Sequence, residues 1–148
     1  MNDIPESTLE VAGRCMCFRA QRAARALARR FDAALRPLGL TNGQFSLLTS
    51  LNRPEPPTIA EVAPLLGMDR TSLTAALKPL VRRGLVDVRP DRTDRRARRL
   101  AITQEGRALL DAALPIWRAE HDRLDAALNM SGVDPGALRA ELGALAAS

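Results

Sequence analysis

The sequence predicts a mainly α-helical protein with one small β-hairpin, and three observations lead to this prediction. Apolar residues recur at helical spacing through two long segments, near residues 9–36 and 104–129. Three shorter segments between them open with helix-capping residues. Residues 85–103 instead alternate apolar and polar side chains around an arginine-rich turn, which is typical of two paired strands.

The composition allows one compact domain of 148 residues, or one domain with appended helices. Hydrophobic residues make up 46% of the chain and charged residues 26%, so a packed core is expected. No apolar run approaches the roughly 20 residues that cross a bilayer, and the acidic start lacks the apolar region of a secretory signal. We therefore expect a cytoplasmic protein without membrane association. Its two cysteines do not indicate a disulfide framework.

The first long helix is expected to run from about Leu9 and to end near Pro37 and Gly39. It would be roughly 40 Å long, which is more than a small domain needs. We therefore expect this helix to pack on a second copy of the chain.

Two capping boxes open the next two helices. Thr41–Gln44 and Thr58–Glu61 have the required spacing, and the helices are expected to run to about Leu51 and Leu66. Residues 52–57 form the loop between them.

A third short helix is expected between Asp69, its N-terminal cap, and Gly84, which stops it after Arg83. Pro79 lies inside this helix and removes one backbone donor, so we expect a bend there and not a break.

The hairpin and the C-terminal helices follow. Residues 85–90 and 97–103 form the predicted strands, with the turn at 91–95. Thr103 caps a second long helix to about Asn129, with a kink at Pro115, and Asp134 with Pro135 opens a final short helix. This order predicts a winged helix-turn-helix lobe at residues 41–103, flanked by helical regions at 1–40 and 104–148.

Positive charge is concentrated in one part of the chain. The net charge is +5 at pH 7, and 21 of the 22 basic residues are Arg, a bias that a GC-rich genome also produces. However, eight arginines lie within residues 82–99, against only three aspartates. Repulsion within such a segment indicates a polyanionic partner, and a thin arginine-tipped loop suits a DNA minor groove.

The helix after Asp69 has one apolar and one polar face. The apolar face, expected to meet the core, consists of Leu73, Ala76, Leu77 and Leu80. The polar face consists of Arg70, Thr71, Thr74, Lys78 and Arg82. Because it carries no acid, the polar face suits a major groove, and Ser72 lies where backbone amides can hold a phosphate. The alternative is the solvated face of an ordinary surface helix.

Three stretches, GLTNGQFSLLTSL, TIAEVAPLLGMDRTSLTAALKPLVRRGLVDV and DRTDRRARRLAITQEG, resemble the MarR family of winged-helix transcription regulators. The resemblance covers nearly the whole chain. It implies a homodimer whose helical dimerisation region consists of residues 1–40 and 104–148. The dimer is expected to bind a pseudo-palindromic double-stranded DNA operator, as a repressor released by a small aromatic or phenolic ligand. No cofactor is implied.

By position, the resemblance assigns DNA contacts in the helix to Arg70, Thr71, Ser72, Thr74 and Lys78. In the wing, the family pattern Asp-x-Arg-Asp-x-Arg is matched at Asp91, Asp94 and Arg96, while Thr93 replaces the first arginine. Arg92 and Arg95 flank this gap, so Arg92, Arg95 and Arg96 are all candidates for the minor groove. Asp94 is expected to orient Arg96 through an ion pair.

Cys15 and Cys17 allow three interpretations. The stretch MCF resembles the peroxide-sensing branch of the family, although that branch has tyrosines near its cysteine and this chain has none. The alternatives are small buried residues of a dimer helix, or residues that line a ligand pocket. On a continuous helix the two thiols would point about 200° apart, so they would bond to each other only after unwinding.

Family members bind small ligands between the dimer helices and the winged lobe, and the candidates here are Arg14, Phe18, Phe45 and Trp117. Aromatic residues at helical spacing also commonly belong to a core. The single histidine, His121, is expected at the surface or in a dimer contact, and no readable spacing indicates a metal site.

Two other classes of function receive less support. The chain shows no nucleophile elbow, phosphate loop or Ser/His/Asp set, so an enzyme is not predicted. A basic protein that binds DNA without sequence preference remains an alternative, whereas a membrane-surface protein would need an amphipathic basic helix with bulky aromatics.

Overall fold

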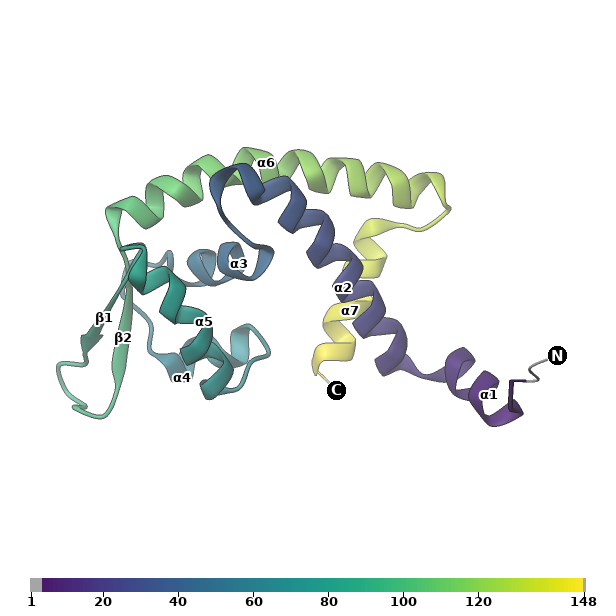
Figure 1. The fold of residues 1–148 in the computed structure, drawn as a ribbon, viewed down its shortest axis with the longest axis horizontal. Coiled ribbons are helices and arrows are strands. Elements are labelled where there is room, and N and C mark those ends of the chain that lie inside the picture. Colours follow the sequence, from purple (N-terminus) through teal and green to yellow (C-terminus); the bar gives the residue numbers. More distant parts are fainter. Residues whose placement is uncertain (1–3, 148) are drawn as a thin grey trace.

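The computed structural model describes residues 4–147, where seven α-helices and a two-stranded antiparallel hairpin form an elongated molecule (Figure 1). Residues 1–3 and 148, which fall in the predicted helical regions 1–40 and 104–148, lie outside the described residues. The elements are α1 (Glu6–Arg14), α2 (Met16–Leu35), the 3-10 turn η1 (Arg36–Leu38), α3 (Asn42–Leu51), α4 (Ile59–Leu65), α5 (Arg70–Arg82), β1 (Val86–Pro90), β2 (Arg98–Ile102), α6 (Gln104–Met130) and α7 (Pro135–Ala147).

The predicted helix caps are confirmed. The Thr41 and Thr58 hydroxyls each accept the backbone N–H of the third helical residue, and the side chain of that residue accepts the backbone N–H of the threonine, so both capping boxes form. Asp69 and Thr103 cap α5 and α6, and the Asp134 carboxylate accepts the Ala137 N–H at 2.6 Å at the start of α7. Helices α5 and α6 continue through Pro79 and Pro115 without a break.

The prediction of one continuous N-terminal helix is wrong, because the chain leaves helical geometry at Cys15. This residue has φ −70° and ψ 107°, so α1 ends before it and α2 begins after it. The Cys15 Sγ atom accepts the Phe18 N–H at 3.4 Å and thereby caps α2. A helix start needs acceptors for its first N–H groups, and a thiol supplies one here.

The core joins the winged lobe to both long helices. Its fully buried side chains are mainly leucines: Leu35, Leu47, Leu48, Leu51, Val62, Leu73, Leu80, Val86 and Leu100. Leu110 and Ala113 of α6 belong to the same cluster. Burial of a leucine side chain contributes about 1.5–3 kcal/mol, so this cluster dominates the stability of the lobe.

Helix α6 runs along one side of the molecule (Figure 1). The hairpin, α3, α4 and α5 lie towards its N-terminal end, whereas α1, the start of α2 and α7 lie away from the hairpin (Figure 1). Ion pairs join α6 to its neighbours: Glu120 binds Arg30 of α2, and Asp125 binds Arg139 of α7 at 2.5 Å.

Between residues 4 and 147, no helix is long and apolar enough to cross a membrane.

Gly106 marks a close approach between α6 and the start of the wing. A Cβ atom at this position would lie 2.3 Å from the Leu85 carbonyl oxygen. A backbone oxygen cannot move aside as a flexible side chain does. We therefore predict that Gly106→Ala lowers the free energy of unfolding by about 1–3 kcal/mol, the cost typical of overpacking.

The matched control is Gly143→Ala in α7, where nothing lies within 4 Å of the added Cβ atom. This change is expected to stabilise the protein by about 0.5–1 kcal/mol, because alanine favours helix more than glycine. Urea unfolding of both variants measures the difference. Equal stabilities for Gly106→Ala and the wild type would contradict the packing of α6 on Leu85.

Candidate nucleic-acid interface

Helix α5 presents the two faces that the sequence predicts. Leu73, Leu77 and Leu80 are buried, and Ala76 is half-buried. Arg70, Thr71, Thr74, Lys78 and Arg82 are all exposed. The Arg70, Lys78 and Arg82 side chains form no hydrogen bond or ion pair with any of the residues described, so their charges face solvent.

The N-terminal end of α5 is capped by Asp69. Its carboxylate accepts the Ser72 N–H at 2.7 Å and the Ser72 hydroxyl at 2.8 Å. These bonds lower the pKa of Asp69, because they stabilise its charged form. The Ser72 donors are therefore already used within the chain, and Thr74 likewise donates its hydroxyl to the Arg70 carbonyl at 2.7 Å.

The wing is a hairpin joined to the segment before α4. Strands β1 and β2 pair in antiparallel register, with Arg89 opposite Arg99 and Pro90 opposite Arg98. On the other side of β2, Thr58 forms a bridge to Arg99, and the Leu100 N–H donates to the Pro57 carbonyl at 2.8 Å. The wing therefore extends from a three-segment base, and its position relative to α4 is fixed by backbone hydrogen bonds.

The wing tip exposes the predicted arginines. Arg92, Arg95 and Arg96 are exposed, and within residues 4–147 their side chains make no hydrogen bond or ion pair. The expected ion pair between Asp94 and Arg96 does not form. Instead, the Asp94 carboxylate accepts the backbone N–H of Arg96 at 2.9 Å, which shapes the turn and leaves the guanidinium unpaired.

A groove of about 520 Å³ connects α5 to the wing. Thr74, Lys78 and Arg82 line it from α5, and Val88, Arg98 and Leu100 line it from the two strands. One edge of the polar face of α5 therefore borders the hairpin. Arg98 was not among the predicted contacts, although alternation along the strand places it on the same side as Leu100.

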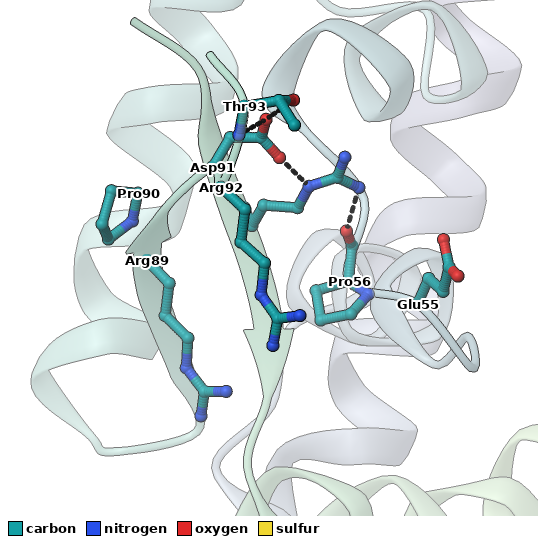
Figure 2. Close-up of a pocket in the computed structure, with 8 residues that line it drawn as sticks. Glu55, Pro56, Arg89, Pro90, Asp91, Arg92 and Thr93 are labelled. Carbon is teal, nitrogen blue, oxygen red and sulfur yellow. Dashed lines mark hydrogen bonds and ion pairs between the residues drawn. The ribbon is translucent and has the colours of Figure 1, made fainter. Parts of the chain in front are cut away.

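A second hollow, of about 450 Å³, lies on another side of the wing (Figure 2). Arg89 and Arg92 point the same way along it, while Glu55 and Pro56 face them from the loop before α4 (Figure 2). Arg89 is paired with Asp87 at 3.0 Å, and both side chains are exposed.

The two cysteines lie at the break between α1 and α2. Cys15 is half-buried and Cys17 is exposed, and both are free thiols. No continuous helix holds the two thiols on opposite sides, as expected from the sequence, because Cys15 is outside both helices. The helical spacing of apolar residues does not predict the break at Cys15, because that spacing continues across it.

The predicted pocket residues separate into two groups. Phe45 stacks on Trp117 with ring centroids 6.0 Å apart, and His121 lies between Trp117 and Phe31 at 4.0 Å and 4.4 Å. Arg14 instead pairs with Glu10 at 2.9 Å, and Phe18 is exposed in the first turn of α2.

The aromatic cluster therefore joins α2, α3 and α6. Beside it, Arg30 and Arg123 lower the pKa of buried Glu120 by hydrogen bonding to its carboxylate. In the described part of the chain, no group of His, Cys, Asp or Glu residues is arranged to hold a metal ion.

Comparisons with known proteins agree with this geometry. A model described as MarR family matches residues 38–97. The transcriptional activatory protein BadR of Rhodopseudomonas palustris is 32% identical over 69% of this chain and 59% of BadR. The match to a second curated relative, the repressor NicR of Pseudomonas putida, spans 50% of NicR, so the chain covers only part of both proteins.

Solved structures match over more of their length. MosR of M. tuberculosis, in complex with DNA, is 38% identical, with 90% of this chain and 94% of MosR covered and a TM-score of 0.81. The repressor CouR, bound to a 23-mer DNA duplex, is 30% identical, with 92% and 95% covered and a TM-score of 0.79. CouR from Rhodococcus jostii RHA1, bound to p-coumaroyl-CoA, is 25% identical, with 90% and 93% covered and a TM-score of 0.74.

A helix-turn-helix followed by an arginine-tipped hairpin defines a winged-helix protein. The family is identified by the match to the family model and by the similarity to MosR over nearly all of both chains. The chain belongs to the MarR family of transcriptional regulators, and this family consists of regulators and not of enzymes.

Proposed function

We propose that this protein is a homodimeric, sequence-specific DNA-binding repressor, present in the cytoplasm, that binds a pseudo-palindromic operator. One observation carries the proposal. Exposed cations of α5 and of the wing lie on the same groove, because Lys78 and Arg82 of α5 line it together with Arg98 of β2. Helix α5 enters a major groove, and the wing enters the adjoining minor groove.

The homodimer is supported by apolar side chains exposed on the terminal helices. They are Leu9, Val11, Met16, Phe18, Leu27 and Leu142. Every residue of α1 is exposed, and only Phe31 and Leu35 of α2 are buried. Such helices need an apolar partner, and a second copy supplies one with matching two-fold symmetry.

Release from DNA by a small aromatic ligand is part of the same proposal. The ring cluster of Phe31, Phe45, Trp117 and His121 lies where the long helices meet the winged lobe. The related protein CouR is bound to p-coumaroyl-CoA, which contains an aromatic acyl group. An aromatic ligand that inserts beside these rings would shift α2 against α6 and change the spacing of the two wings.

The main prediction concerns duplex binding. The wild type is expected to bind a labelled duplex from its own upstream region far more tightly than a scrambled duplex. Arg96→Ala is expected to weaken binding to all duplexes and to reduce the slope of log K against log[salt] by about 1, because one phosphate contact is lost. Lys78→Ala is expected to change which sequence is preferred.

Fluorescence anisotropy across a salt series measures both effects. The matched control is Arg118→Ala, since Arg118 is an exposed arginine on α6, outside the proposed surface. Equal affinity for specific and scrambled duplexes would instead support the non-specific alternative. If the slope of log K against log[salt] were unchanged in Arg96→Ala, the proposed contact of the wing with DNA would be contradicted.

A redox-regulated repressor is the second candidate function, and the position of Cys15 favours it. The Cys15 Sγ atom is a free, half-buried thiol at the N-terminal end of α2, where it accepts a backbone N–H. Oxidation of this thiol to a sulfenic acid would remove the cap of α2.

We therefore predict that an organic hydroperoxide releases the wild type from its operator and that dithiothreitol restores binding. Cys15→Ser is expected to stay bound under the same treatment, because serine also caps helices but resists oxidation. Cys17→Ser is the matched control for thiol content. If all three proteins respond alike in a mobility-shift assay, Cys15 is not a redox sensor.

A further inference from the structure

One arginine of the wing points towards the protein and not towards solvent. The Arg99 side chain is 35% exposed, and its partner Asp91 is 8% exposed. The Arg99 Nε–H donates to Asp91 Oδ1 at 2.5 Å, and its Nη1–H donates to the Pro56 carbonyl at 2.9 Å (Figure 2). A single guanidinium therefore joins the wing tip to the loop before α4.

The Asp91 carboxylate also organises the tip itself. Its second oxygen, Oδ2, accepts the Thr93 N–H at 3.1 Å, the Thr93 hydroxyl at 2.8 Å and the Asp94 N–H at 3.0 Å. Arg99 and the tip donors together lower the pKa of Asp91. One oxygen thus accepts from Arg99, which also binds the loop before α4. The other oxygen binds the turn that carries the exposed arginines.

We propose that Asp91 and Arg99 are a positioning pair that fixes the direction of the wing tip and thereby places Arg92, Arg95 and Arg96 against DNA. This inference rests on the proposed DNA-binding function. Neither member needs to contact DNA, since each is already engaged within the lobe. Three unpaired arginines at a tip without this link would repel one another and spread over many directions.

The Asp91→Asn variant distinguishes a positioning role of Asp91 from a purely electrostatic effect of its negative charge on DNA binding. The asparagine carbonyl can still accept the tip N–H groups, but its NH₂ group would then face the donors of Arg99, so the link to the lobe is lost. Removal of a carboxylate from a DNA-facing surface should strengthen binding on Coulombic grounds alone. A positioning role predicts the opposite sign, a loss of affinity of roughly tenfold at physiological salt, similar to the loss of one or two phosphate contacts.

Arg99→Lys breaks the same link from the other side at constant charge, because one ammonium group replaces the two guanidinium contacts. It is expected to weaken binding as Asp91→Asn does, and the double variant should be no weaker than either single variant. Asp87→Asn is the matched control, since Asp87 is an exposed carboxylate on β1 that is paired only with Arg89. It should bind duplex at least as tightly as the wild type.

The readout that distinguishes positioning from loss of fold is the effect of Arg96→Ala in each background. In the wild type this change should lower affinity and salt slope, whereas in Asp91→Asn it should change neither, because Arg96 no longer reaches its phosphate. Thermal unfolding of each variant checks that the lobe is intact.

Binding by Asp91→Asn and Arg99→Lys as tight as by Asp87→Asn would overturn the positioning pair and leave the DNA-binding proposal standing. A wild type that binds no duplex in dilute buffer would overturn the proposed function itself, and this inference with it.

Discussion

The packing of α5 against the hairpin is the contact on which the cationic surface depends. Leu73, Leu77 and Leu80 of α5 are buried in the same cluster as Val86 and Leu100 of the strands. Because these side chains are packed together, the backbones of α5 and of the hairpin, which carry the outer charges, keep a constant spacing. Like charges held close together on a rigid frame repel one another, and a polyanion relieves that repulsion. The fold therefore maintains a cationic surface that a polyanion would stabilise.

Most of the lobe could be predicted because its signals are local. A capping box needs two residues three positions apart, and an amphipathic helix needs only its own periodicity, so α3, α4 and α5 follow from short windows. The break at Cys15 could not be predicted in this way. Apolar spacing continues from Ala12 through Met16 to Ala20, while the break is accompanied by two contacts, the Phe18 N–H to the Cys15 thiol and the Arg19 side chain to the Gly13 carbonyl.

The candidate site was predicted by residue type but not by pairing. The exposed arginines of the wing and the polar face of α5 are where the sequence places them. The sequence predicts that Asp94 pairs with Arg96, whereas the structure pairs Asp91 with Arg99. Eight arginines and three aspartates within residues 82–99 allow many pairings, and the folded hairpin forms two of them, Asp87 with Arg89 and Asp91 with Arg99. A short stretch of sequence also does not predict contacts between distant residues, such as the hydrogen bond from Arg99 to the Pro56 carbonyl.

In the proposed complex, two copies would present paired α5 helices and wings to one face of a duplex. Hydroxyl-radical footprinting of the upstream region tests this claim most directly, because it reports backbone protection nucleotide by nucleotide. The expected pattern is two-fold symmetric, with protected backbone around two successive major grooves and additional protection in the flanking minor grooves that disappears in Arg96→Ala. Uniform protection along the fragment, or a single unsymmetrical patch, would contradict it.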